Sequence, residues 1–267
     1  MPHIETAALT LYYEEKGEGD PVLFISGTGS DLRVKPNLMD GPLPKVRRTI
    51  AFDQRGLGQS DKPIGPYAMA QYADDTANLL NVLNIERVDV IGVSFGGMVA
   101  QHFALRHASR VNKLVLCCTS PGGDMPSYPF HELPDDITLQ ERVVRLMAVS
   151  DVRRDQVWQA ENPKEVEQIL TYTANHAIVE HATDEFKRGA RLQLLARAEH
   201  NVVEALPELR MPVLICAGKY DGIAPPENQH ALHQLLPNSE LAWFEGGHLF
   251  MIQDKAAWGT IIEFLSV

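Results

Sequence analysis

The sequence predicts an α/β fold, with a mostly parallel central sheet flanked by helices and an inserted helical cap. The first observation is a series of short, largely apolar runs bounded by Gly, Pro or polar turns. This pattern is typical of strands buried on both faces of a parallel sheet. The runs are Val22–Ile25, Thr49–Phe52, Val88–Ile91, Leu114–Cys117 and Val213–Cys216. The second observation is that helical patterns separate these runs, which indicates an α/β fold.

The other elements of the sheet domain are predicted from shorter patterns. Residues Leu9 to Glu14 resemble one arm of an N-terminal hairpin that ends at the Lys16–Pro21 turn. Near the C-terminus, the run Leu241–Phe244 predicts a last strand, and Lys255–Leu265 a final helix. A further helix is predicted by residues that share one helical stripe, namely Tyr72, Thr76, Leu79, Leu80 and Leu83.

The alternation is interrupted after the loop Ser120–Pro126, where charged and mostly helical segments replace the strand-like runs. Helices are expected over Glu141–Ser150, Lys164–Thr173 and Asp184–His200. The strand pattern resumes after Leu206-Pro207. Because loops at a functional edge tolerate large insertions, the expected organisation is a core of residues 1–121 and 206–267 with a helical cap of residues 122–205.

Composition and charge exclude several classes of protein. The 267 residues are 45% hydrophobic and 22% charged, which are ordinary globular values. A net charge of -11 disfavours nucleic acid and anionic membranes as partners. No apolar run is as long as a membrane span, and the N-terminus lacks the segments of a signal peptide, so a cytoplasmic location is expected. The three cysteines, Cys117, Cys118 and Cys216, are an odd number and are expected to pack in the core.

Residues Gly92-Val93-Ser94-Phe95-Gly96 lie between the strand Val88–Ile91 and a helical pattern that starts at Met98. Small neighbours on both sides allow a serine to sit on a strained turn between strand and helix, with its hydroxyl exposed for attack. Gly-x-Ser-x-Gly also occurs by chance in a chain with 19 glycines. The strand before it, the helix after it, and an acid and then a histidine later in the chain favour a nucleophile at Ser94.

His248 is the candidate general base. The chain has ten histidines, and a histidine is more often a surface or core residue than a catalyst, so its position must decide. Gly246-Gly247-His248 follows the last predicted strand, where the imidazole can face the turn that carries Ser94.

Asp221 is the candidate acid that would orient this imidazole. It follows the strand Val213–Cys216 and precedes His248 in the chain, as the serine motif requires. Asp-Gly is also a common turn former. Asp124 is the competing acid, because it lies beyond the strand that ends near Cys118.

Two backbone amides are expected to stabilise the negative oxygen that forms during attack on a carbonyl. One is that of Phe95, at the start of the helix after Ser94. The other is that of Thr28, in the glycine-containing loop Ser26–Ser30. This loop is not a dinucleotide fingerprint, because Leu32 occupies the third glycine position. No Cys-x-x-Cys or His-Glu-x-x-His spacing occurs, so neither a metal nor a cofactor is implied.

These segments together resemble an α/β-hydrolase with a helical cap, and the resemblance runs nearly end to end. It includes Ser26-Gly27 and Asp53–Ser60, in which Arg55 and Ser60 are interpreted as structural. Ser26 departs from the family pattern, because many relatives carry histidine there. A serine at position 94 argues against haloalkane dehalogenases and epoxide hydrolases, which resemble this scaffold but use aspartate.

The stretches Gly65–Tyr67, Gly96–Gln101 and Gly247–Leu249 look most like 3-oxoadipate enol-lactonase and small carboxylesterases. This resemblance implies a serine hydrolase that cleaves small carboxylic esters or lactones through an acyl-enzyme on a Ser-His-Asp triad. The alternatives are a C–C bond hydrolase of the meta-cleavage type, a cofactor-free haloperoxidase or perhydrolase, and a small-molecule receptor on the same fold. Leu146 and Met147 are candidates to face the substrate, and a homo-oligomer is left open.

Overall fold

The computed structural model describes residues 2–134, 136–176 and 183–267. Within these residues, eight strands form one sheet in the order β1-β2-β4-β3-β5-β6-β7-β8. The strands are β1 (His3–Glu5), β2 (Thr10–Lys16), β3 (Pro21–Ile25), β4 (Arg48–Phe52), β5 (Val88–Val93), β6 (Val111–Cys117), β7 (Val213–Gly218) and β8 (Ser239–Phe244). From β4 to β8 every neighbouring pair is parallel. The predicted mostly parallel sheet is therefore confirmed.

The N-terminal hairpin differs from the prediction in its partner. β2 pairs with β1 through a turn that Thr6 closes by donating to the carbonyl of Leu9, and its other neighbour is β4. β3, which follows the Lys16–Pro21 turn, pairs with β4 and not with β2. Gly17 and Gly19 adopt positive φ in this turn and carry the chain past the position that β4 occupies.

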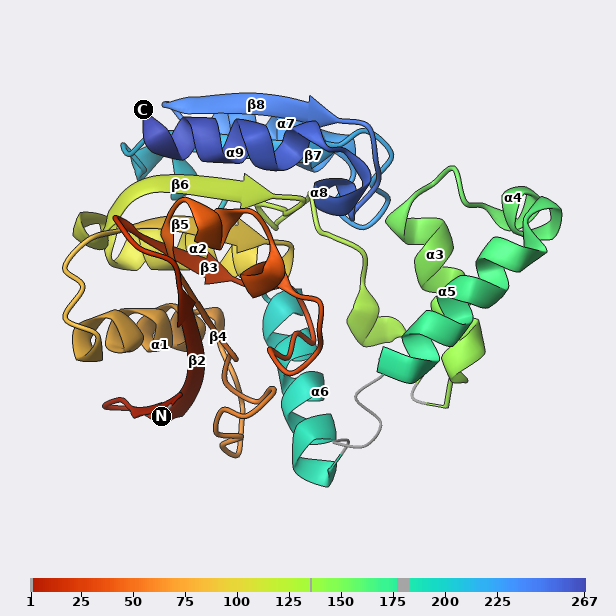
Figure 1. The fold of residues 1–267 in the computed structure, drawn as a ribbon, viewed down its shortest axis with the longest axis horizontal. Coiled ribbons are helices and arrows are strands. Elements are labelled where there is room, and N and C mark those ends of the chain that lie inside the picture. The colour runs from red at the N-terminus through yellow and green to blue at the C-terminus, as the bar shows by residue number, and fades with distance from the viewer. Residues whose placement is uncertain (1, 135, 177–182) are drawn as a thin grey trace.

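Helices cover both faces of the sheet (Figure 1). They are α1 (Met69–Val82), α2 (Phe95–Arg106), α3 (Leu139–Ser150), α4 (Gln156–Glu161), α5 (Pro163–His176), α6 (Asp184–Ala198), α7 (Pro226–Leu235), α8 (Phe250–Gln253) and α9 (Ala256–Ser266). Short 3₁₀ turns occur at Leu38–Asp40, Leu43–Lys45, Ala108–Arg110, Phe130–Glu132 and Leu206–Glu208. Each described helix is too short or too polar to cross a bilayer.

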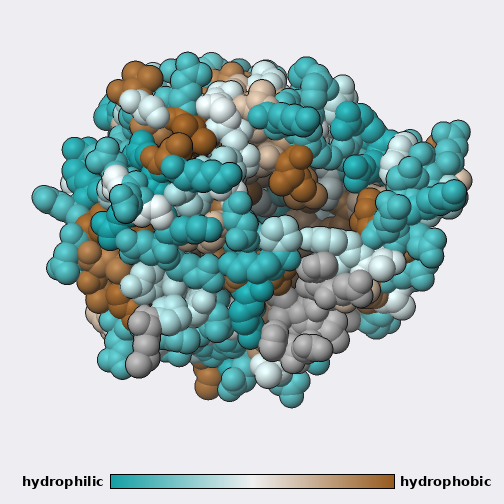
Figure 2. Space-filling model, in the orientation of Figure 1, coloured by the Kyte–Doolittle hydropathy of each residue, from teal (hydrophilic) through white to brown (hydrophobic). Residues whose placement is uncertain are grey.

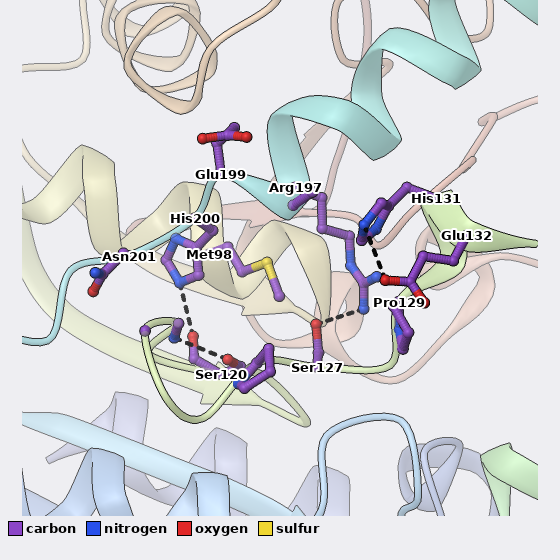
Figure 3. A pocket seen from close by; sticks show the side chains of 14 residues that line it. Met98, Ser120, Ser127, Pro129, His131, Glu132, Arg197, Glu199, His200 and Asn201 are labelled. Atoms are coloured by element: carbon purple, nitrogen blue, oxygen red, sulfur yellow. Dashed lines mark hydrogen bonds and ion pairs between the residues drawn. The ribbon is translucent and has the colours of Figure 1, made fainter.

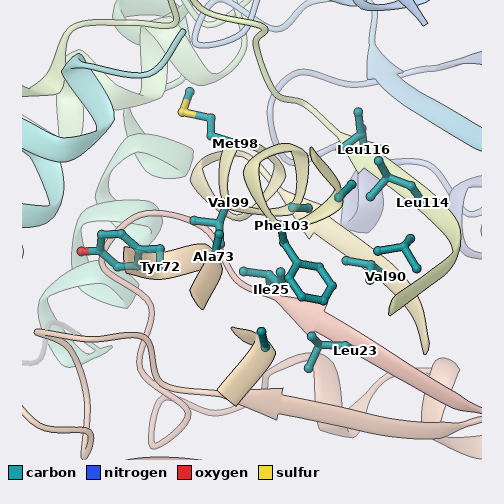
Figure 4. Packing of buried hydrophobic residues seen from close by; sticks show 14 of the residues in the cluster. Leu23, Ile25, Tyr72, Ala73, Val90, Met98, Val99, Phe103, Leu114 and Leu116 are labelled. Carbon is teal, nitrogen blue, oxygen red and sulfur yellow. The ribbon is translucent and has the colours of Figure 1, made fainter. Parts of the chain in front are cut away.

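The core consists of two apolar clusters, one on each face of the sheet. On the first face, side chains of α1, α2 and α7 pack against β3, β5, β6 and β7, and Figure 4 shows Phe103 of α2 among Leu23 and Val90. On the second face, α8 and α9 pack against the same strands. The stripe predicted on α1 is buried as expected at Tyr72, Thr76, Leu79 and Leu80, with Leu83 partly buried.

The inserted segment, residues 122–205, lies between β6 and β7 and contains α3, α4, α5 and α6. Thr138 caps α3 in a reciprocal arrangement with Glu141, and Asp155 and Thr183 cap α4 and α6. α4 was not predicted. In Figure 1, α3, α4 and α5 stand apart from the sheet on the side toward which the arrowheads of β6 and β8 point. The carboxyl ends of the parallel strands therefore face this segment.

Candidate active site

Ser94 occupies the sharp turn between β5 and α2. Its backbone has φ 55° and ψ −116°, a conformation that is costly for a residue with a Cβ and is typical of functional sites. The turn is held because the Ser94 carbonyl accepts from the amides of Gly97 and Met98 and from Oγ1 of Thr119, at 2.7 Å. α2 begins at Phe95 rather than at the predicted Met98.

Glycine at position 96 allows the turn to approach the neighbouring strand. A Cβ added to Gly96 would lie 2.0 Å from the carbonyl oxygen of Ile25, at the end of β3. No real Cβ comes so close to an oxygen, so any larger residue would push α2 away from β3. Close packing of these two elements brings the Ser26–Ser30 loop beside the serine, and a Cβ on Gly27 would lie 3.5 Å from Ser94 Cβ.

The three residues predicted as a triad lie together. His248 Nε2 is 3.0 Å from Ser94 Oγ, and His248 Nδ1 is 2.8 Å from Asp221 Oδ2. An Nδ1–H that donates to the carboxylate leaves Nε2 free to accept from the hydroxyl. Asp221 Oδ1 accepts from the amides of Ile223 and Ala224 at 2.8 and 3.0 Å. Asp124 is exposed, and it is Asp221 that bonds the imidazole.

The loop that carries His248 is attached to the inserted segment. The His248 amide donates to the carbonyl of Ser150, the last residue of α3, at 2.6 Å. A Cβ on Gly247 would lie 2.0 Å from that same carbonyl. A side chain at position 247 would prevent this approach, which joins the imidazole loop to α3.

The surroundings of His248 favour its protonated form. Burial lowers the pKa of His248, whereas Cys118 and Asp221 raise it, and the net shift is upward. Burial also raises the pKa of the Cys118 thiol, so the thiol is neutral near pH 7. The Asp221 carboxylate is then the charge that stabilises imidazolium.

The same three side chains also form a cluster of possible metal ligands. The ligand atoms of Cys118, Asp221 and His248 all lie within 4.8 Å of one another.

The Ser26–Ser30 loop is held from two sides by buried glutamines. Gln54 Nε2 donates to the carbonyl of Ser26 at 2.8 Å, and Gln193 Oε1, on α6, accepts from the amide of Gly29 at 2.9 Å. Among the described residues, the amides of Thr28 and Phe95 donate to no protein acceptor. Neither glutamine was predicted, because an isolated glutamine in a sequence gives no signal of burial.

A cavity of about 470 Å³ opens above Ser94 and His248. The inserted segment contributes Phe130, Leu133, Leu146, Ala190, Gln193 and Leu194 to its wall, together with the exposed Arg142. Figure 2 shows apolar side chains around the hollow between α8 and the inserted helices. Leu146 lines the cavity as expected, whereas Met147 is buried within the inserted segment and is absent from the wall.

A second cavity, of about 500 Å³, is lined by Ser127, Pro129 and His131 (Figure 3). Its wall includes Arg197, whose two terminal nitrogens donate to Tyr128 O and Ser127 Oγ at 2.6 Å. The guanidinium lies over the Phe130 ring, 4.5 Å from its centre. Burial lowers the pKa of Arg197 to about 10. The arginine therefore fixes the segment Ser127–Phe130, which contributes side chains to both cavities.

Arg55 and Ser60 have the structural roles expected of them. Arg55 bonds the buried Asp75 through two nitrogens at 2.6 and 2.8 Å. The Ser60 hydroxyl donates to the carbonyl of Asp53 and accepts from the amide of Tyr12. These bonds fix the turn after β4.

The comparisons with known proteins agree with this architecture. A family model described as "alpha/beta hydrolase fold" matches residues 20–148. Poly(3-hydroxyalkanoate) depolymerase of Ectopseudomonas oleovorans is 30% identical over 250 residues, which cover 91% of this chain and 82% of the relative.

Two solved structures superpose over almost the whole chain. The putative non-heme bromoperoxidase BpoC of Mycobacterium tuberculosis has a TM-score of 0.82 and 25% identity, with 99% of this chain and 98% of that chain covered. The enol-lactonase of Burkholderia xenovorans has a TM-score of 0.80 and 23% identity, with 100% of both chains covered. On the sequence matches and the fold, this chain belongs to the α/β hydrolase fold family.

Proposed function

We propose that the protein is a serine hydrolase that cleaves small carboxylic esters or lactones through an acyl-enzyme. The observation that carries the proposal is the continuous line of hydrogen bonds from Ser94 through His248 to Asp221 at the floor of a largely apolar cavity. A buried serine needs such a base to become a nucleophile. The relative at 30% identity supports an ester substrate, because poly(3-hydroxyalkanoate) units are joined by ester bonds.

The first half of the reaction forms the acyl-enzyme. His248 Nε2 takes the proton of Ser94 as Oγ attacks the carbonyl carbon, and the carbonyl oxygen becomes negative. The amides of Thr28 and Phe95, for which the described part of the chain offers no acceptor, are the proposed donors to this oxygen. The C–O bond to the leaving group then breaks, and His248 returns the proton to the departing alkoxide.

The second half regenerates the enzyme. A water molecule gives its proton to His248 Nε2 and attacks the acyl carbon, and collapse of the second intermediate breaks the bond to Ser94 Oγ. Ser94 recovers its proton from His248, and the carboxylic acid leaves. For a lactone, the leaving alcohol stays attached to the acyl group throughout, and the product is a single hydroxy acid.

Residues 122–205 are the proposed cap over this site. Their side chains supply much of the cavity wall, and a covered site excludes water and limits the size of the acyl group. The cavity volume of about 470 Å³ favours short substrates over lipid chains. Small uncharged esters and lactones should therefore be hydrolysed faster than long-chain lipids.

The competing function is that of a haloperoxidase or perhydrolase, which the similarity to BpoC favours. A panel of short and long p-nitrophenyl esters, lactones, emulsified triglyceride and a vinylogous 1,5-diketone separates the activities, with bromination assayed in parallel. We expect short esters or lactones to be the best substrates. Faster turnover of triglyceride would contradict the small-substrate proposal, and cleavage of the diketone alone would identify a C–C hydrolase.

A further inference from the structure

Gln193 lies at the contact between α6 and the loop that carries the proposed Thr28 donor. Its side chain is fully buried, and its Oε1 accepts from the Gly29 amide at 2.9 Å across 164 positions of sequence. Gly29 has φ 70°. The bond fixes the peptide plane directly after Thr28, and so limits rotation of the residue whose amide would hold the oxyanion.

The other end of the same side chain is unsatisfied. Gln193 Nε2 is buried and has no hydrogen-bond partner within the described chain. A buried donor without an acceptor costs about 1–3 kcal/mol. An apolar side chain of the same length would avoid this cost, but it would leave the Gly29 amide without its acceptor. The glutamine therefore combines an unpaired Nε2 with a bond that holds Gly29. Local costs of this kind are characteristic of functional sites.

α6 is held firmly enough to position Gln193. On one side of it, Gly189 packs on Gly56 so closely that an added Cβ would lie 2.1 Å from the Gly56 oxygen. On the other side, Arg197 is tied to Ser127 and Tyr128 (Figure 3). The acceptor therefore comes from a helix that is anchored to the core and to the segment before α3.

We propose that Gln193 is a positioning residue that couples the inserted segment to the oxyanion hole, through its bond to the Gly29 amide. This inference rests on the proposed function. Within residues 2–134, 136–176 and 183–267, the one comparable side-chain bond from the core to the loop runs from Gln54 to the carbonyl of Ser26, on the other side of Gly27. Loss of the Gln193 bond should loosen Thr28 selectively, and with it the stabilisation of the transition state.

Replacing Gln193 by Met tests the proposal, because methionine has a similar length but no acceptor. We expect kcat to fall about 10- to 100-fold, less than the 10²- to 10³-fold that follows complete loss of an oxyanion donor. KM should change little. The unfolding midpoint should also change little, because the variant removes the unsatisfied Nε2 donor but leaves the half-buried Gly29 amide unpaired. A boronic acid, which forms a tetrahedral adduct with serine, should lose affinity in parallel with kcat/KM.

The matched control is Leu194→Met, on the same helix and in the same cavity wall. This variant should change KM rather than kcat. Its affinity for the boronic acid should fall no more than its affinity for the substrate. Hydrogen exchange of the Gly29 amide should accelerate in Gln193→Met and not in the control.

The outcomes separate this inference from the proposed function. Ester hydrolysis that depends on Ser94, together with a wild-type kcat in Gln193→Met, would overturn the positioning role alone. If Gln193→Met lowers kcat and also lowers the free energy of unfolding to the same extent, Gln193 has only a structural role. Absence of Ser94-dependent hydrolysis in the wild type would overturn the proposed function itself.

Discussion

His248 Nε2 lies 3.0 Å from Ser94 Oγ although 154 positions separate the two residues in the chain. Each side chain is placed by its own backbone: Ser94 by the turn between β5 and α2, and His248 by a loop bonded to Ser150. The contact therefore requires both loops at the same edge of the sheet. Changes in either backbone should affect activity even where neither side chain is altered.

Asp221→Asn should lower kcat by roughly 10⁴, as the equivalent change does in serine proteases, because asparagine favours the wrong imidazole tautomer. The matched control is Asp124→Asn, which removes an exposed carboxylate and should have little effect. Steady-state kinetics on one ester measures both. Reversed severities would assign the orienting role to Asp124.

The activity should rise with pH along an acidic limb that lies above the ordinary histidine range. The general base must be neutral to accept a proton from Ser94, and the Asp221 carboxylate raises the pKa of His248. The kcat/KM profile of the free enzyme reports this pKa. A limb centred below the usual value of 6.5 would show that burial outweighs the carboxylate.

Gly96→Ala should both destabilise the protein, by about 1–3 kcal/mol, and lower activity, because its Cβ would collide with the Ile25 carbonyl. Gly259→Ala is the control. A Cβ at Gly259 in α9 would meet nothing within 4 Å, and the change should stabilise the helix by about 0.5–1 kcal/mol. Urea unfolding measures both. A neutral Gly96→Ala variant would contradict the close packing of α2 on β3.

Stability should fall as the pH is lowered from 6.5 toward 4. His102 Nε2 and His200 Nδ1 are 3.1 Å apart in the interior, and burial lowers the pKa of His102 to about 4 and that of His200 to about 3. The unfolded chain therefore binds protons in this range that the folded chain does not bind. Asp53, Asp75 and Asp89 oppose the trend, because burial raises the pKa of each carboxyl group, that of Asp53 to about 6.

His200→Gln should flatten this dependence of the unfolding free energy on pH. The unfolding midpoint in urea, measured at several pH values for the wild type and the variant, checks this. An equal slope in wild type and His200→Gln would be inconsistent with a neutral, buried His200.

The strands and the serine turn could be predicted because their signals are local. A parallel strand covered on both faces is apolar throughout, as in Val22–Ile25, and the glycines around Ser94 reflect contacts of the turn itself. The partner of β2 could not be predicted in this way. It depends on β4, which enters between β2 and β3 from later in the chain.

The parts of the site that depend on distant contacts were less predictable. Asp124 and Asp221 both follow strands, and only the fold distinguishes the acid that reaches His248. Met147 and Leu146 are neighbours on one helix, but Leu146 lines the cavity, whereas Met147 is buried and does not. Gln193 and Cys118 carry no sequence signal, because their roles arise from what packs against them.

The central claim is that Ser94 is an activated nucleophile, and covalent labelling with a fluorophosphonate tests it most directly. Intact-mass analysis followed by peptide mapping should find one adduct, on Ser94, with loss of ester hydrolysis in proportion to labelling. Ser94→Ala should neither be labelled nor hydrolyse esters, with a fold unchanged by circular dichroism. An unlabelled wild-type protein, or ester turnover by purified Ser94→Ala, would contradict the account.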